Sequence, residues 1–169
     1  MATKYENVYN RFINKIKKDK NFFSYKNCTE DEIEAIIKRR CFSLLDEATI
    51  LVNNEIANFE IDFTDRNDED EAFNFDLIKI EEELIAEKMY FLYFKEEEVK
   101  VKQMQKYLGN DISMFSPAEE RKTFENMLEK VNSRYEKILD DYNARLRDGS
   151  GYNLTGVSED EVSVVSSWI

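Results

Sequence analysis

The chain has no histidine, one proline, four glycines and two cysteines among its 169 residues. The absence of histidine excludes Ser–His–Asp and Cys–His catalysis and every metal site that uses an imidazole ligand. Phosphate-binding loops of the GxxxxGK[ST] or GxGxxG type are also absent from the sequence. The two cysteines, Cys28 and Cys41, are isolated, so we expect reduced, structural thiols.

Long apolar runs are absent too. No stretch approaches the roughly 18 uninterrupted apolar residues from which a membrane-spanning helix is recognised. The N-terminal stretch has no apolar segment of the kind found in secretory signals. We therefore expect a protein that is cytosolic, or that assembles from the cytosol, with no membrane partner.

Charge and hydrophobicity set the class of protein. There are 36 acidic and 24 basic residues, which gives a net charge of −12. Such a surface repels phosphate backbones and disfavours a nucleic-acid-binding protein. Hydrophobic residues make up 42% of the chain and charged residues 36%. This balance, with so little proline and glycine, predicts a mainly helical protein with one domain and a real core.

The N-terminal part predicts two helices. Apolar residues recur at intervals of three and four over residues 4–18, which is typical of an amphipathic helix. A connection follows from Asp19 to Cys28. Thr29 and Glu32 form a capping-box pattern ahead of a second apolar run. That second helix either continues through Ile56 or breaks and restarts.

The period changes in the next segment. Phe59, Ile61 and Phe63 alternate with acidic residues, and Phe73 and Phe75 alternate with an asparagine, which indicates extended chain. We expect a short β-hairpin or two extended arms within residues 59–75. The TDRNDEDEA sequence between them predicts an acidic loop that faces solvent or a channel, with the residues Asp65, Asp68, Glu69, Asp70 and Glu71.

A long central helix is predicted from Asp76 to Leu108, with Asp76 as its N-cap. Apolar residues stand seven apart in two rows, and the glutamates are expected mostly off this face, in solvent. One interpretation ends this helix near Lys95 and places a weaker helix from Glu98 onward. Four aromatic residues near its end point all round the helix, more than one neighbouring helix can cover. We therefore predict a subunit interface at Tyr90, Phe91, Tyr93 and Phe94.

The last helix has the clearest start signal, because Ser116, Pro117 and Glu119 follow the order of cap, first helical residue and capping-box partner. Apolar residues from Phe124 to Tyr142 then follow at spacings of four and three, so this helix should lie antiparallel along the central one. Arg145 and Arg147 suit the negative end of the helix dipole.

A glycine- and serine-containing sequence, residues 148–151, is expected to end the folded part. Two interpretations of residues 149–169 are open, a disordered terminus or an extended arm that adds a strand to a partner. The arm would bind through Tyr152, Leu154, Val162, Val164, Val165, Trp168 and Ile169.

Candidate chemistry is sparse. The acidic run from Asp65 can be aligned with a calcium loop, but Asp70 stands where the turn needs glycine and Asp76 stands where the last ligand should be glutamate. Runs of glutamate on amphipathic helices are usually solvated, so they do not indicate acid–base catalysis. We expect no catalytic residues, no metal and no cofactor.

The layout from about Phe75 to Tyr142 resembles a known family. The sequence FNFDLIKIEEELIA leads to the aromatic-rich EKMYFLYF, a loop containing Gln103 and Gln105 follows, and FSPAEERKTFENMLEKVNSRYEKILDDY gives the capped final helix. This order resembles the head–tail connector, or adaptor, proteins of long-tailed bacteriophages that infect low-GC Gram-positive bacteria. Two short N-terminal helices, a longer pair and a C-terminal arm also look like that family.

The resemblance implies a structural virion protein and not an enzyme. Such proteins form a homo-oligomeric ring, usually a dodecamer, beneath the portal protein in the neck of the virion. The arm reaches the portal, and the helical body lines the DNA channel and receives the next neck or tail-completion protein. A negative wall suits a channel through which DNA passes without specific binding. The alternative is an acidic helical interaction protein, such as a scaffold, an inhibitor or a DNA mimic, with no virion role.

Overall fold

The computed structural model describes residues 2–17, 20–23, 25–57, 61–108, 117–144, 146–148 and 151–153. The chain is mainly helical, as predicted. Its helices are α1 (Tyr5–Ile16), α2 (Lys20–Phe23), α3 (Glu30–Glu55), α4 (Lys79–Leu108) and α5 (Pro117–Asn143). Two small antiparallel hairpins are formed by β1 (Arg66–Asn67) with β2 (Ala72–Phe73), and by β3 (Leu146–Asp148) with β4 (Gly151–Asn153).

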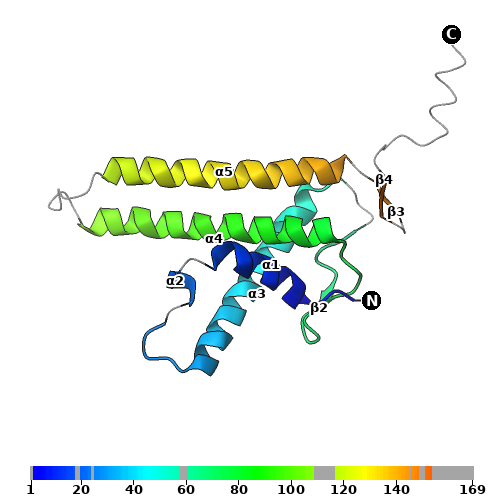
Figure 1. Ribbon diagram of the computed structural model, residues 1–169, viewed down its shortest axis with the longest axis horizontal. Coiled ribbons are helices and arrows are strands. Elements are labelled where there is room, and N and C mark those ends of the chain that lie inside the picture. Colours follow the sequence, from blue (N-terminus) through cyan, green and yellow to red (C-terminus); the bar gives the residue numbers. More distant parts are fainter. Residues whose placement is uncertain are drawn as a thin grey trace, which may run out of the picture.

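Helices α4 and α5 lie side by side and antiparallel, and they form the long axis of the molecule (Figure 1). The predicted seam of α5 faces α4, with Val131, Tyr135 and Tyr142 buried along it. Helices α1 and α3 pack against α4 over only part of its length. We call Lys79–Tyr93 the inner half of α4 and Phe94–Leu108 the outer half. The outer half leads toward the end of the pair that extends beyond α1, α2 and α3 (Figure 1).

The N-terminal helices follow the sequence patterns. The buried residues of α1 include Tyr5, Val8 and Phe12, at the spacing that predicted this helix. The Thr29 side chain accepts a hydrogen bond from the Glu32 backbone, and the Glu32 carboxylate accepts one from the Thr29 backbone at 2.8 Å. The predicted capping box is thus confirmed. Helix α3 runs unbroken to Glu55, and the short helix α2 lies where only a connection was expected.

The hairpin β1–β2 confirms that a short hairpin lies within residues 59–75, although Phe59 lies outside the described residues. The expected strand positions are wrong, because β1 falls in the sequence predicted as the acidic loop, and Ile61 and Phe63 lie outside any strand. The N-terminal segment runs beside β2, because Tyr5 N donates to Glu71 O at 2.8 Å and Phe73 N donates to Thr3 O at 2.9 Å. These bonds connect the start of α1 to the chain that enters α4.

The start of α4 differs from the prediction. Asp76 is not its N-cap, because the helix begins at Lys79 and the Glu81 carboxylate accepts a hydrogen bond from Ile78 N at 2.9 Å. Glu81, the third residue of the helix, therefore accepts a hydrogen bond from the Ile78 backbone N–H, which has no partner within the helix and which an aspartate cap was expected to satisfy. The helix also continues past Lys95 to Leu108, with neither glycine nor proline in between to end it.

The end of the described chain also differs. Helix α5 ends at Asn143, so Arg147 lies in β3 and not at a helix terminus; Arg145 lies outside the described residues. Strand β3 pairs with β4, and Arg147 stands opposite Tyr152. Regular structure therefore continues to Asn153, past the point where we expected the folded part to end.

Candidate functional site

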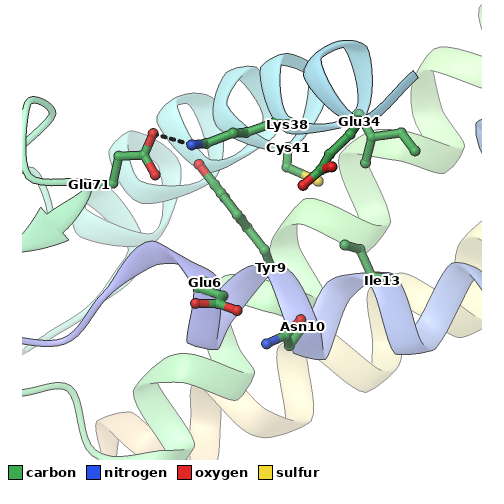
Figure 2. Close-up of a pocket in the computed structure, with 9 residues that line it drawn as sticks. Glu6, Tyr9, Asn10, Ile13, Glu34, Lys38, Cys41 and Glu71 are labelled. Carbon is green, nitrogen blue, oxygen red and sulfur yellow. Dashed lines mark ion pairs between the residues drawn. The ribbon is translucent and has the colours of Figure 1, made fainter. Parts of the chain in front are cut away.

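A pocket of about 280 Å³ lies between α1 and α3, next to the turn that precedes β2 (Figure 2). A second pocket of about 310 Å³ adjoins it, since Tyr9, Lys38 and Glu71 line both. Lys38 and Glu71 form an ion pair of 2.7 Å. No sequence motif predicts these pockets, because their walls come from two helices and a turn that only the fold brings together.

Three charged side chains of the inner half of α4 are buried. Glu81 and Glu87 have no exposed surface, and Lys88 is almost fully buried. The expectation that this charged run faces solvent is therefore wrong for these three residues. The physical reason is that α1, α3 and α5 all pack against α4, so that little of its inner half faces water.

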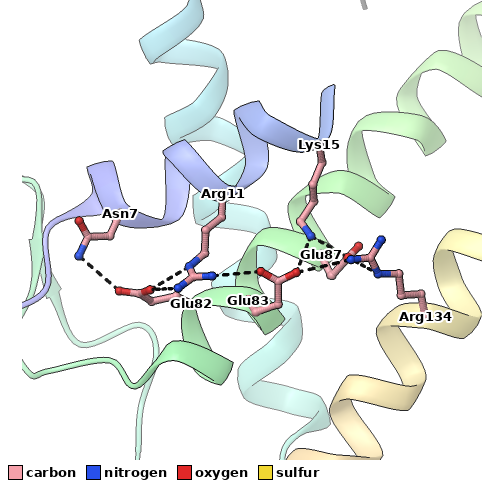
Figure 3. A network of polar contacts seen from close by, with 7 residues as sticks. All are labelled: Asn7, Arg11, Lys15, Glu82, Glu83, Glu87 and Arg134. Carbon is pink, nitrogen blue, oxygen red and sulfur yellow. Dashed lines mark hydrogen bonds and ion pairs between the residues drawn. The ribbon is translucent and has the colours of Figure 1, made fainter. Parts of the chain in front are cut away.

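On the α1 side, two basic residues pair with three carboxylates (Figure 3). Arg11 Nη2 lies 2.7 Å from Glu82 Oε2. Lys15 Nζ lies 2.5 Å from Glu83 Oε1 and 2.8 Å from Glu87 Oε1. Burial alone would raise the pKa of Glu83, but the hydrogen bond from Lys15 and the charges of Lys15, Arg11 and Arg134 hold it below its usual value.

On the α5 side, Arg134 Nε lies 2.7 Å from Glu87 Oε1 (Figure 3). Glu87 therefore joins α1, α4 and α5 through one carboxylate oxygen. Its other oxygen, Oε2, is buried and has no hydrogen-bond partner among the residues that the structure describes. A buried carboxylate of this kind depends on its cations, so this contact should matter for the fold.

On the α3 side, Lys88 Nζ donates to both carboxylate oxygens of Glu55, at 2.7 and 2.9 Å. The Tyr135 hydroxyl donates to the same carboxylate, and Lys88 Nζ lies 4.3 Å from the centre of the Tyr135 ring. Burial and the Glu55 carboxylate both raise the pKa of Tyr135. Glu55, Lys88 and Tyr135 thus connect the C-terminus of α3 to the α4–α5 pair.

These contacts fix how the helices are aligned, and they offer little for catalysis. The lowered pKa of Glu83 keeps it ionised, whereas a general acid at neutral pH needs a raised pKa. A signal for the buried charges was present in the sequence. Glu81 and Lys88 stand in the same row as Ile78, Ile85 and Leu92, where a solvated residue would not be expected.

The aromatic end of the inner half is covered more fully than predicted. Tyr93 is only 1% exposed, and its ring centre lies 5.4 Å from that of Phe22 and 6.2 Å from that of Phe12. The argument that one chain cannot cover these aromatics is therefore wrong for Tyr93. The short helix α2, which was not predicted, supplies Phe22.

The other three predicted interface residues, Tyr90, Phe91 and Phe94, are half-buried. Phe94 has ring contacts with Tyr90, at 4.8 Å between centres, and with Phe124 of α5, at 5.9 Å. Farther along α4, Val99 is 48% exposed, and Met127 of α5, one turn from the Phe124 that contacts Phe94, is 40% exposed. Apolar surface of the α4–α5 pair therefore remains exposed around and beyond the boundary between the two halves of α4.

The acidic loop is mostly exposed. Asp65, Asp68, Glu69 and Asp70 are exposed, and Glu71 is half-buried in its ion pair with Lys38. Arg66, however, belongs to the same predicted loop and is largely buried. It pairs with Asp46 of α3, and its guanidinium lies 5.7 Å from the centre of the Phe42 ring. Arg66 therefore attaches the loop to α3, and the loop is not solvated along its whole length.

The predicted arm lies largely outside the described residues. Tyr152 belongs to β4, and Leu154, Val162, Val164, Val165, Trp168 and Ile169 lie beyond it. Within the described part of the chain, Cys28 and Cys41 are free thiols, and no cluster of acidic, cysteine or histidine side chains could hold a metal ion. None of the helices, over the residues described, is long and apolar enough to span a membrane.

Comparison of the chain with protein-family models, with curated proteins and with solved structures finds no match.

Proposed function

We propose that this chain is a structural subunit of a virion neck. It forms a ring beneath the portal protein that joins capsid to tail and surrounds the DNA channel. The observation that carries the proposal is apolar surface on the α4–α5 pair around and beyond the boundary between the two halves of α4. Phe94 is only half-buried, Val99 is 48% exposed, and Met127, one turn along α5 from the Phe124 that contacts Phe94, is 40% exposed. Uncovered apolar surface on a projecting helical pair favours burial against another subunit.

Charge supports the same proposal. The net charge of −12 is carried in part by the exposed carboxylates of the loop before β2. A wall of carboxylates does not hold phosphates, so DNA can slide past it. The long antiparallel pair fits the resemblance to phage connectors, but α3 has 26 residues and is not one of the two short N-terminal helices that the resemblance implies.

The DNA-mimic alternative is less well supported. A mimic needs exposed, unpaired carboxylates spaced along one face of a helix. On α4, Glu82, Glu83 and Glu87 are instead paired with cations of α1 and α5. This weighs against α4 as a mimicking surface.

Electron microscopy of negatively stained protein mixed with its portal tests the proposal. We expect rings on the portal, and we expect the Met127→Glu variant to lose them because a charge would enter the contact. Ile50→Glu is the matched control, since Ile50 is an equally exposed apolar residue on α3. It should keep the rings. The absence of rings with the unmodified protein would reject the proposal.

The arm has a separate test. Deletion of residues 154–169 leaves the β3–β4 hairpin in place. We expect the truncated chain to keep its helical circular dichroism and to lose portal binding. Unchanged portal binding would remove the arm from the proposal.

A further inference from the structure

The pocket between α1 and α3 contains a tyrosine hydroxyl that has no hydrogen-bond partner among the described residues. Tyr9 is only 9% exposed, and its side chain extends from α1 across the pocket toward α3 (Figure 2). No hydrogen bond joins its hydroxyl to any residue that the structure describes, although other tyrosines of the core, such as Tyr5 and Tyr135, have such bonds. A hydroxyl on a largely buried ring that opens onto a pocket offers a hydrogen bond to a group that enters it.

The charge along the wall of this pocket is negative overall, although the Tyr9 hydroxyl itself lies beside the Lys38 ammonium (Figure 2). Glu6, Glu34 and Glu71 line the pocket, against the single ammonium of Lys38. That ammonium is already paired with Glu71 at 2.7 Å, on the side where the two pockets meet. The carboxylates of Glu6 and Glu34 therefore determine the sign of the potential for an entering group, and they favour a cation.

The rest of the wall is apolar. Ile13 and Ile37 line the pocket together with the buried thiol of Cys41, whose pKa is raised to about 12 by burial and which is therefore uncharged. The ring of Tyr9 adds an aromatic face. A ligand that fits this wall has a short hydrocarbon stem behind its charged end, because the stem contacts the apolar side chains while the cation meets the carboxylates.

We propose that this pocket binds an ammonium or guanidinium group on a short apolar stem. The cation lies near Glu6 and Glu34, donates a hydrogen bond to the Tyr9 hydroxyl oxygen, and places its stem against Ile13 and Ile37. Two sources carry this chemistry, a free amine or the arginine or lysine side chain of another protein chain. The site does not depend on ring formation, and it is present in the single subunit.

Nuclear magnetic resonance of the full-length, isotope-labelled protein tests the proposal with agmatine, which has a guanidinium and an ammonium on a butyl stem. We expect saturable shifts of the backbone amides of Asn10, Ile13 and Lys38. Butanol has the stem without the charge and should leave them unshifted. No saturable shift at these amides with agmatine, or equal shifts with butanol, would overturn the proposal.

Three variants locate the binding. Tyr9→Phe removes only the unpartnered hydroxyl, and we expect binding to weaken roughly two- to tenfold, the range that one hydrogen bond carries. Glu34→Gln removes a carboxylate from the exposed rim and should weaken binding as well, even if Tyr9→Phe disturbs the fold. Glu47→Gln makes the same charge change on α3 outside the pocket and should have no effect. Equal weakening by Glu34→Gln and Glu47→Gln would mean general attraction to a negative protein, and it would reject the site.

The source of the cation follows from a second probe, N-acetyl-arginine N-methylamide, which presents the same guanidinium on a peptide backbone. Tighter binding of this capped arginine than of agmatine supports the pocket as a receptor for a side chain of another protein. Tighter binding of agmatine supports it as a site for a free amine. Failure of both probes to shift these amides would reject the inference while leaving the ring proposal untouched.

Discussion

The two halves of α4 belong to one continuous helix and differ in almost every physical respect. The inner half is enclosed by α1, α3 and α5, and it contains Glu81, Glu87 and Lys88 without access to bulk water. The outer half leads into the projecting end of the α4–α5 pair (Figure 1); Val99 on it is exposed, and so is Met127 of α5, close to the boundary between the halves. Charged residues are thus inside at one end of the helix, and apolar residues are outside at the other.

This contrast between buried charges and exposed apolar residues concerns two properties of the chain, the stability of its fold and its association with other subunits. Buried ion pairs tolerate little displacement, because a carboxylate that loses its cation in the interior remains charged and unsolvated. The pairs of the inner half therefore favour a single alignment of α1 and α5 on α4. Exposed apolar surface on the outer half adds little to the stability of one subunit, but it is available to another. We infer that the inner half maintains the fold and that the outer half serves assembly.

The largest expected effect on the free energy of unfolding comes from Tyr93, and the comparison is with Phe94, its neighbour across the boundary between the inner and outer halves of α4. Tyr93→Ala should lower the free energy of unfolding by roughly 3–5 kcal/mol, because it empties a fully enclosed site between Phe12 and Phe22. Phe94→Ala should cost about 1–2 kcal/mol, since its ring is only half-buried. Urea unfolding followed by circular dichroism measures both. Equal losses would show that the two halves are equally enclosed, contrary to our distinction.

A second pair of variants compares charges. Glu87→Ala should cost about 1–2 kcal/mol, because it removes a buried carboxylate that pairs with Lys15 and Arg134, while Lys15 keeps Glu83 and Arg134 is 60% exposed to water. Glu96→Ala changes an exposed glutamate on the outer half and should stay within about 0.5 kcal/mol of the unmodified protein. The same urea experiment measures both variants. A loss for Glu87→Ala as small as that for Glu96→Ala would mean that the buried pairs are solvated in solution.

Local patterns were sufficient to predict much of the fold. The capping box at Thr29, the helix that starts at Pro117, the antiparallel seam to Tyr142 and the hairpin within residues 59–75 each depend on neighbours in sequence. The start of α4 was misplaced by two residues, because a glutamate inside the helix can replace a cap that precedes it. The helix α2 was missed because four residues are too short for a periodic pattern.

The features of the candidate sites were harder to predict, because they depend on contacts between distant segments. Lys88 pairs with Glu55, Arg134 with Glu87, and Arg66 with Asp46. A charge on an amphipathic helix faces solvent unless several elements surround it, and the sequence alone did not show that three helices enclose this one. The pocket at Tyr9 likewise needs α1, α3 and the turn before β2 to be placed together.

Acid sensitivity should also distinguish the two halves, with the smallest effect of the three. Because Lys15, Arg11 and Arg134 together lower the pKa of Glu83 below its ordinary 4.5, against the opposing effect of burial, its carboxylate stabilises the folded state above pH 4.5. This contribution, on the order of 1 kcal/mol for a partly buried ion pair, is lost as the pH falls through the lowered pKa. The difference in unfolding free energy between the unmodified protein and Glu83→Gln should therefore shrink as the pH is lowered from 7 into the acid range, and Glu96→Gln on the outer half is the matched control. Urea midpoints at a series of pH values measure this. The titration of the other carboxylates is common to both proteins in each comparison and therefore cancels. If the difference in unfolding free energy between the unmodified protein and Glu83→Gln stays constant with pH, the ion pairs of Glu83 do not persist in solution.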